Sequence, residues 1–211
     1  MAANVRHPIF ARVYDRMSRA DERHGGAELR AELLGGLTGR VLEVGAGNGL
    51  NFAHYPTTVS EVIAVEPEAH LRKRASEAAA DAPVPVTVRD GTADALPTSD
   101  SSCDAAVASL VLCSVPDPTA ALAELRRILR PGGELRFYEH VVANRPGLAR
   151  VQRIVDAAIW PRVGGGCHTA RDTLVAIERS GFTIRHSRRF TRPSFPGDPS
   201  APHVLGIADV T

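Results

Sequence analysis

A glycine-rich turn after a short apolar stretch is the feature that most restricts the fold of this chain. Residues 41–44 are apolar except for Glu43, which is the pattern of a strand covered on both faces. Gly45, Gly47 and Gly49 follow, and residues without a Cβ let the backbone turn tightly and approach a ligand. A carboxylate within an apolar strand also needs partners. Both features indicate a ligand site at the carboxyl end of a strand, where open α/β sheets bind ligands.

The spacing of the glycines distinguishes two classes of cofactor. A dinucleotide-binding turn, G-x-G-x-x-G, would have its third glycine at position 50, where the chain has Leu50. The glycines instead follow G-x-G-x-G, with Glu43 two residues before the first of them. This spacing resembles motif I of the class I methyltransferases that use S-adenosylmethionine (SAM). The resemblance implies SAM as the cofactor, beside Asn48 of the turn and the nearby Asn51; a NAD-dependent oxidoreductase is the alternative.

A second acidic residue supports a nucleoside site. The apolar stretch 62–65 predicts a strand that ends at Glu66, 21 residues after Gly45, and Pro67 stops it. An acid at this spacing hydrogen-bonds the ribose hydroxyls, because a carboxylate can accept from both. The alternative for Glu66 is a solvated strand end. We expect Glu66 and Pro67 to border the ribose of the cofactor.

Residues 89–97 resemble the loop that lies beside the adenine in type 11 methyltransferase domains. The aspartate that accepts from the adenine amino group in that family falls on Thr92 here. Thr92 can still hydrogen-bond, and Ala93, after Gly91, can offer its backbone N–H to a ring nitrogen. Asp90 takes the aspartate's role if the loop is shifted by two residues, and the sequence leaves both alignments open.

The transferable methyl group is expected at the ends of two further strands. Residues 103–109 predict a strand whose end faces the methyl in class I enzymes, which makes Ser109 and Leu110 candidates for cofactor contact. The next strand, 134–138, leads to His140. We expect Cys113, which also lies near the methyl, to point into the core.

Later segments narrow the resemblance. V-L-C-S-V at 111–115, L-R-P-G-G at 129–133 and E-H-V at 139–141 are together similar to the thiol S-methyltransferases of animals and their bacterial relatives. The resemblance implies a small-molecule methyl acceptor, with a thiol as one class. A thiol with a pKa of ~8.5 needs only modest help to become a thiolate. His140, which can titrate near neutrality, is the candidate catalytic group for that help.

Two alternatives remain open for the function. Bacterial phosphatidylethanolamine methyltransferases share with this chain a Y-D opening at 14–15 and a V-P-D-P segment at 115–118, so N-methylation of a phospholipid headgroup is one alternative. The other is a SAM-binding protein without catalysis, because the glycines, Glu43 and Glu66 indicate binding and not turnover.

The order of apolar patterns predicts the fold class. We expect an α/β, Rossmann-like three-layer sandwich with a seven-stranded, mostly parallel sheet and an antiparallel last strand. One SAM-dependent methyltransferase domain is expected over 1–211. The glycine turn is expected to open a helix over 49–55, and the Pro- and Ser-rich stretch 192–202 is expected to be a loop.

Two segments outside the core sheet are expected to cover the site. The first, 1–38, would be a helical lid, and its helix over 5–19 has Ile9, Val13 and Met17 on one face. Its Y-D segment resembles the opening of many SAM methyltransferases, and the resemblance implies that Tyr14 reaches the methionine carboxylate of SAM; the alternative is a helix packed on the domain edge. The second, 144–170, would be an insertion on the substrate side. Its helix is expected over 148–160, with Val151, Ile154, Val155 and Ile159 on its apolar side.

Composition restricts the partners. The net charge of +1 gives no support to a nucleic-acid partner, and no apolar run approaches the ~18 residues of a membrane span, so no stable membrane insertion is expected. Cys103, Cys113 and Cys167 form neither a C-x-x-C pair nor a metal-ligand spacing. We therefore expect no metal site and a reducing, cytoplasmic setting. The oligomeric state is left open.

Overall fold

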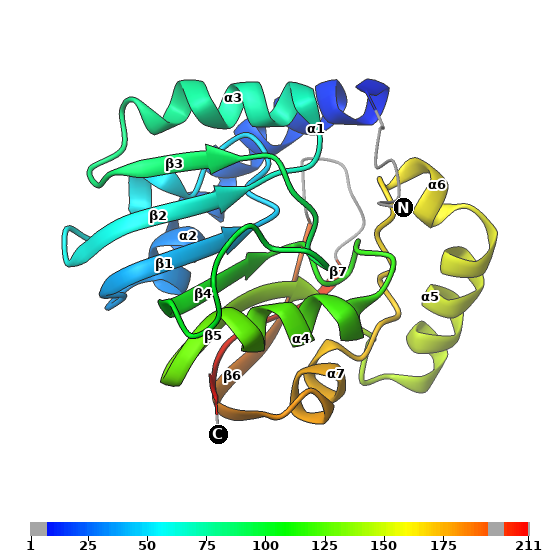
Figure 1. Ribbon diagram of the computed structural model, residues 1–211. Helices are drawn as coiled ribbons and strands as arrows, with labels where there is room; N and C mark the ends of the chain where they lie inside the picture. The colour runs from blue at the N-terminus through cyan, green and yellow to red at the C-terminus, as the bar shows by residue number, and fades with distance from the viewer. Residues whose placement is uncertain (1–7, 194–200, 211) are drawn as a thin grey trace.

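The protein is built on one seven-stranded sheet, which confirms the predicted fold class (Figure 1). The computed structural model describes residues 8–193 and 201–210. The strand order is β3-β2-β1-β4-β5-β7-β6, and β7 runs antiparallel to both of its neighbours. The strands are β1 (Gly39–Val44), β2 (Val59–Val65), β3 (Val86–Arg89), β4 (Cys103–Ser109), β5 (Leu129–His140), β6 (Phe182–Arg192) and β7 (Ala201–Val210).

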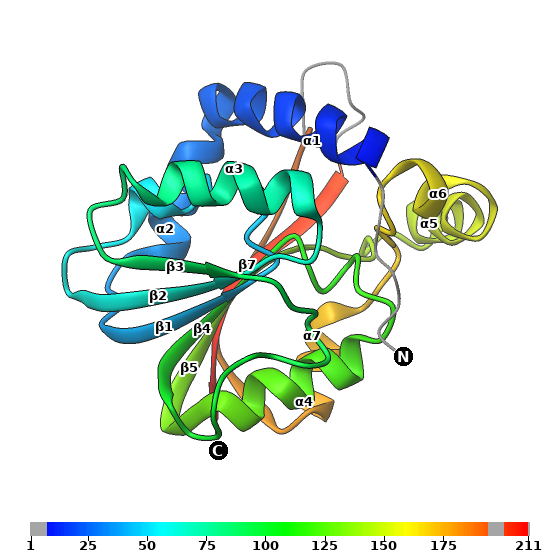
Figure 2. The same ribbon diagram turned by 45° about the horizontal axis from the view of Figure 1, so that its top comes forward.

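Helices cover both faces of this sheet, as Figures 1 and 2 show from two directions. One face carries α1, α2 and α3, and the opposite face carries α4 and α7. The pair α5 and α6 stands apart from both layers, beyond the carboxyl ends of β4 and β5. The helices are α1 (Pro8–Asp21), α2 (Ala27–Leu34), α3 (Ala69–Ala79), α4 (Pro118–Ile128), α5 (Pro146–Ala158), α6 (Trp160–Val163) and α7 (Thr173–Arg179).

The two faces of β1 belong to two separate apolar cores. Leu42 lies in the core on the α4 side, where Leu122 and Leu125 of α4 are fully buried. Val41 lies in the core on the opposite side, where Leu34 of α2 is fully buried. A strand buried on both faces cannot alternate polar and apolar residues, which explains the near-continuous apolar run of this segment.

Strand register brings the predicted site residues to one edge of the sheet. Val44 lies opposite Val65, so the glycine turn after β1 and Glu66 after β2 leave the sheet side by side. The Ala46 N–H donates to the Val65 carbonyl oxygen at 3.1 Å and fixes this relation. On the other side of β1, Ser109 at the end of β4 lies opposite Tyr138 of β5.

The predicted helix over 49–55 is wrong. The chain forms only a short 3-10 turn there, Phe52–His54, before it enters β2. Tyr55 is extended, with φ −66° and ψ 129°, because a residue before proline is disfavoured in the helical region and Pro56 follows. Phe52 is fully buried in the core that also contains Leu33 and Leu34 of α2.

The helix of the 144–170 insertion also differs from its predicted packing. Val151, Ile154 and Ile159 are 53%, 60% and 57% exposed, so they do not form the face that packs on the domain. Ala149 and Gln152 are the buried residues of α5 instead. None of the helices in the described residues is long and apolar enough to cross a membrane. The N-terminal part of the predicted 5–19 helix and most of the 192–202 loop lie outside the described residues.

Candidate cofactor and acceptor site

The turn after β1 requires glycine at its strained positions. Gly45, Gly47 and Gly49 have φ of +63°, +58° and +80°, a region that residues with a side chain rarely adopt. A Cβ on Gly45 would lie 2.4 Å from Cγ2 of Val111, and one on Gly49 would lie 2.8 Å from the ring of Phe52. The sequence pattern of this turn is therefore explained by both backbone conformation and space.

Glu66 lies directly against this turn. Its Oε2 accepts from the Gly47 N–H at 2.8 Å, and its Oε1 accepts from the Glu68 N–H at 2.9 Å. The side chain is buried, and burial raises the pKa of Glu66 although both N–H donors oppose that shift. Pro67 follows, and its carbonyl oxygen accepts from Arg72 at 2.9 Å. Glu66 is thus held in place by backbone donors, and a carboxylate retains lone pairs for further donors.

Glu43, at the end of β1, binds two residues that follow the glycine turn. Its Oε1 accepts from the Asn51 side-chain amide at 2.7 Å, and its Oε2 accepts from the Tyr55 hydroxyl at 2.8 Å. Burial raises the pKa of Glu43 to about 7. The side-chain oxygen Oδ1 of Asn51 in turn accepts from Arg30 of α2 at 2.7 Å. Both predicted residues, Glu43 and Asn51, are therefore in contact with each other, and sequence reasoning missed the donors Tyr55 and Arg30.

Asn48 connects the turn to α1. Its side-chain amide donates to Asp15 Oδ1 at 2.9 Å and to Ser18 Oγ at 3.0 Å. Ala11, Asp15 and Ser18 are the buried face of α1, whereas Val13 is 47% exposed. The prediction that Val13 lies on the buried face of this helix is thus wrong. Asp15 and Ser18 lie on the buried face, where they accept from the side-chain amide of Asn48. Sequence periodicity alone gave no signal for this polar contact.

Tyr14 extends from α1 to the glycine turn. A Cβ on Gly47 would lie 3.4 Å from Cε1 of Tyr14, so the ring rests on the backbone of the turn. Burial raises the pKa of Tyr14, and the charges of Glu66 and Cys113 add to that shift against the effect of Arg30.

The loop after β3 separates the two adenine candidates. The Asp90 side chain is 72% exposed and pairs with Arg72 at 3.1 Å. Thr92 forms a tight turn in which its carbonyl oxygen accepts from the Ala95 N–H at 3.2 Å. Gly91 packs close to the end of β2, where an added Cβ would lie 3.0 Å from Val65 Cγ1. Gly91 thus lies beside the end of β2, and Asp90 points outward to a cation.

The end of β4 carries a strained residue. Leu110, which follows Ser109, has φ +59°, and its N–H donates to the Tyr138 carbonyl oxygen at 2.6 Å. A bulky residue in the left-handed region costs about 1–2 kcal/mol, and such strain concentrates at functional sites. The conformation turns the chain sharply at the sheet edge, next to the glycine turn.

Glu139 holds the loop that follows, and sequence reasoning missed this role. The side chain is fully buried, and its two oxygens accept from the N–H groups of Val111, Leu112 and Cys113 at 2.9, 2.8 and 3.0 Å. Burial raises the pKa of Glu139 well above its ordinary range. An apolar–acid–His sequence at a strand end gives a weak signal for such a residue, because the donors come from the loop after another strand, β4.

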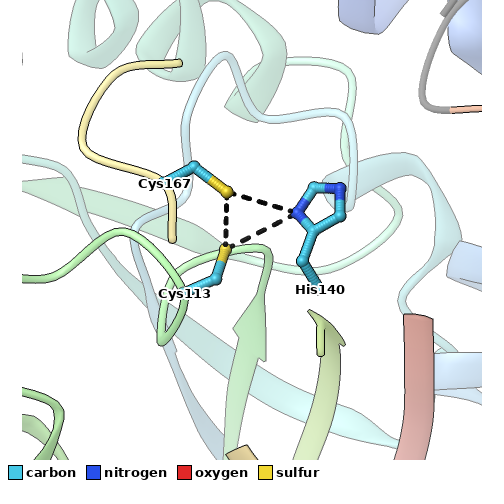
Figure 3. A group of neighbouring side chains, drawn as sticks. All are labelled: Cys113, His140 and Cys167. Carbon is cyan, nitrogen blue, oxygen red and sulfur yellow. Dashed lines mark hydrogen bonds between the residues drawn. The ribbon is translucent and has the colours of Figure 1, made fainter. Parts of the chain in front are cut away.

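His140 meets two cysteine thiols at this loop (Figure 3). Its Nδ1 lies 3.7 Å from Cys113 Sγ and 3.5 Å from Cys167 Sγ, and the two sulfurs are 3.6 Å apart. Cys113 is buried in the interior, as expected, and its thiol there faces His140 and Cys167. Along the chain, His140 follows Cys113 by 27 residues and Cys167 follows His140 by 27 residues, and no local sequence motif spans such distances.

Comparison with known proteins decides the family. Residues 42–137 match the family model described as "Methyltransferase domain". The thiol S-methyltransferase TMT1B of Mus musculus is 36% identical over 180 residues, covering 83% of this chain and 73% of that protein. The chain belongs to the class I SAM-dependent methyltransferases. The human thiol S-methyltransferase TMT1B is 35% identical over 188 residues, covering 86% of this methyltransferase and 76% of its own length.

Solved structures agree in the fold of the methyltransferase. A SAM-dependent methyltransferase from Thermotoga maritima has a TM-score of 0.69, covers 96% of this chain and 98% of its own, and is 23% identical. At this identity the likeness concerns the fold alone. Family membership makes SAM the cofactor and the protein an enzyme, so the NAD-dependent alternative is wrong and the non-catalytic alternative is not favoured.

Proposed function

We propose that this methyltransferase transfers the methyl group of SAM to the sulfur of a small thiol. The observation that carries the proposal is the 36% and 35% identity to proteins named thiol S-methyltransferases over most of the chain. The position of His140, at the end of β5 beside Leu112 and Cys113, supports it from the structure, because it places an ionisable group at the acceptor side of the sheet edge.

The cofactor contacts are part of the same proposal. Glu66 binds the ribose hydroxyls, and the glycine turn with Asn48 and Tyr14 encloses the methionine part of SAM. Glu43 and Asn51 hold the turn in shape, since their polar atoms already bind each other and Tyr55. The loop of Gly91, Thr92 and Ala93 receives the adenine, and the exposed pair of Asp90 with Arg72 supports the choice of Thr92. Ser109 and Leu110 face the methyl group.

The remaining segments fit this assignment. Residues 1–38 act as a lid over the cofactor, supported by the contacts of Asn48 and Gly47 with α1. Residues 144–170 border the acceptor, supported by the place of α5 and α6 at the sheet edge (Figure 1). A reducing compartment such as the cytoplasm suits the three free cysteines.

Methyl transfer from SAM is an in-line displacement with an excellent leaving group, so positioning supplies most of the catalysis. The nucleophile is the thiolate, and a thiol with a pKa of ~8.5 is largely protonated at neutral pH. The site must therefore help the acceptor lose its proton. His140 is the group that we assign to this task.

A product assay tests the acceptor class. Purified protein with SAM is offered matched thiols, amines and phenols of similar size, and formation of S-adenosylhomocysteine is followed with time. We expect turnover with thiols and little with their amine and phenol counterparts. Turnover that favours an amine or a phenol over its thiol would refute the proposal. Vesicles containing phosphatidylethanolamine serve as a further arm, and N-methylated lipid as the main product would refute it equally.

A further inference from the structure

The three side chains of Cys113, His140 and Cys167 have the dimensions of a metal site. Zinc is bound at about 2.3 Å by sulfur and about 2.1 Å by nitrogen, so a tetrahedral ion separates two sulfurs by about 3.8 Å and sulfur from nitrogen by about 3.6 Å. The observed separations are 3.6 Å between the sulfurs and 3.7 and 3.5 Å to Nδ1. These values agree to within about 0.2 Å, the tolerance expected for a preformed metal site.

The donor set selects the metal and its role. Two thiolates with one imidazole suit zinc among the common divalent ions. Structural zinc sites have four protein ligands, whereas catalytic sites have three and keep one position open. Among the residues that the structure describes, the cluster contains these three ligand atoms, within 4.8 Å of one another, and no fourth His, Cys, Asp or Glu joins them. The set therefore matches a catalytic site with an open position.

A disulfide explains the cluster less well. The cysteines are free, and a sulfur–sulfur bond of about 2.05 Å would require the two sulfurs, now 3.6 Å apart, to approach by more than an ångström. It would also leave Nδ1 of His140 directed at a bond between two sulfurs, which is a poor hydrogen-bond partner. All three ligand atoms converge on one point in Figure 3, as a bound ion requires.

The surrounding chain holds the ligands in place before any ion binds. Glu139 accepts from the Cys113 N–H, and the Cys113 carbonyl oxygen accepts from the His168 N–H at 2.7 Å, which joins the loops of both cysteines. Gly166 allows this close approach, because a Cβ there would lie 2.9 Å from the Ser114 carbonyl oxygen. Arg171 donates to two carbonyl oxygens of the Cys113 loop, each at 2.7 Å. A rigid set of ligands lowers the entropic cost of binding.

The cluster lies on the acceptor side of the enzyme. Cys113 follows Leu110 by three residues in the loop after β4, and His140 is the last residue of the neighbouring strand β5. The loop that carries Cys113 also packs against the glycine turn, since a Cβ on Gly45 would lie 2.4 Å from Cγ2 of Val111. The three ligands are therefore close to the place where SAM presents its methyl group.

We propose that Cys113, His140 and Cys167 bind a zinc ion whose open position takes the sulfur of the acceptor thiol. The inference deepens the proposed function and depends on it for the identity of the acceptor. Binding of the ion releases the protons of both cysteine thiols to solvent, and His140 coordinates as a neutral ring through Nδ1. His140 thus promotes thiolate formation as a metal ligand.

The chemical step balances without any further reactant. The acceptor thiol loses its proton to solvent as its sulfur coordinates zinc, because a coordinating thiol is deprotonated. That sulfur then attacks the methyl carbon of SAM and forms the new carbon–sulfur bond. The bond between the methyl and the sulfonium sulfur breaks, and its electron pair stays on the sulfur of S-adenosylhomocysteine. The neutral thioether is a weaker ligand than the thiolate and leaves the metal.

Metal analysis of the full chain tests the site without any substrate. We expect one zinc ion per chain after equilibration with zinc and gel filtration. Each of Cys113→Ala, His140→Ala and Cys167→Ala should weaken zinc binding by more than about 100-fold, since losing even a hydrogen-bond partner of a ligand costs about 10–100-fold. Cys103→Ala is the matched control, because Cys103 is a buried free thiol at the opposite end of β4. Equal zinc affinity in all four variants would overturn the proposal.

Cobalt provides a measurement on the unsubstituted protein, which remains decisive if a variant does not fold. Co²⁺ in the site should show thiolate-to-cobalt charge-transfer absorption and the visible bands of tetrahedral cobalt. Addition of a small thiol should shift these bands as it enters the open position. Absence of the charge-transfer absorption would overturn the site.

Turnover separates this inference from the proposed function. Protein freed of zinc by a chelator should still bind S-adenosylhomocysteine but should lose thiol methylation, which zinc restores. With zinc the rate should be nearly independent of pH below the pKa of the acceptor, whereas residual metal-free turnover should rise toward about pH 8.5 with the thiolate fraction. Equal thiol turnover with and without zinc would overturn the inference and leave the proposed function intact. Zinc binding by the three residues with no thiol turnover would instead refute the thiol acceptor.

Discussion

Replacement of Glu66 by glutamine removes one negative charge from the cofactor site and changes little else. The side chain is 5% exposed, and its two oxygens accept from the N–H groups of Gly47 and Glu68 at 2.8 and 2.9 Å. Glutamine offers one oxygen, so one N–H keeps its acceptor and the other faces an amide donor. The change therefore acts both on the unliganded turn and on the contact with the ribose.

The magnitude follows from the kind of hydrogen bond that is lost. A bond to a charged acceptor contributes about 1.5–3 kcal/mol, against about 0.5–1.5 kcal/mol for a neutral one. For two ribose hydroxyls the loss is about 2–3 kcal/mol, which corresponds to about 30–150-fold weaker binding. The N–H left without an acceptor costs about 1–3 kcal/mol of folding free energy. Burial offsets part of that cost, because it already disfavours the charged form and raises the pKa of Glu66.

Titration calorimetry with S-adenosylhomocysteine measures the effect on binding. Glu61→Gln is the matched control, since Glu61 lies on β2, the strand that precedes Glu66, with a side chain that is 43% exposed and paired with Arg40. We expect the control to bind like the unsubstituted protein, because an exposed ion pair is worth at most about 1 kcal/mol and lies away from the turn. If Glu66→Gln binds within about threefold of the unsubstituted protein while its circular dichroism is unchanged, the ribose assignment is refuted.

Three further changes test other parts of the site. The pKa of Glu43 is raised from 4.5 to about 7, so the stabilisation that comes from its protonated form is fully present below pH 4.5 and is lost as the pH rises through 7. Relative to Glu43→Gln, the free energy of unfolding measured by urea titration should therefore fall by up to about 3 kcal/mol over this window. A parallel pH dependence of the two proteins would contradict the assignment. Gly45→Ala should lower the free energy of unfolding by about 2–4 kcal/mol, because it places a Cβ at a positive φ and 2.4 Å from Val111 Cγ2. An unchanged melting temperature would argue against this turn geometry. Glu139→Ala should cost at least about 3 kcal/mol in urea unfolding, since three buried N–H groups lose their acceptor, and a cost under about 1 kcal/mol would show that the loop reorganises.

Local patterns in the sequence were sufficient for the fold class and the turn. The run 41–44 predicted a strand covered on both faces, and Gly45 with Gly47 predicted a sharp turn after it; the structure shows both. The place of Glu66 at the end of the second strand was predictable, because the apolar run 62–65 that precedes it is a pattern of neighbouring residues. These features depend on neighbours in sequence, which periodicity and spacing describe well.

Contacts between distant segments were beyond such reasoning. The helix predicted over 49–55 does not form. Pro56 keeps Tyr55 extended, and the Tyr55 hydroxyl donates to Glu43 in this conformation. The buried face of α1 is polar because it meets Asn48, a residue of another segment. Hydrophobic periodicity cannot reveal a buried polar face, since it counts only apolar positions.

The sequence by itself determined a parallel α/β sheet, the glycine turn at its edge and the acid that follows the second strand. The tertiary structure alone decided what surrounds them: the donors that satisfy Glu43, the loop held by Glu139 and the meeting of Cys113, His140 and Cys167. The reason is physical. Strands and tight turns are set by interactions over a few residues, whereas a site is set by side chains that the sheet brings together from strands and loops far apart in the chain.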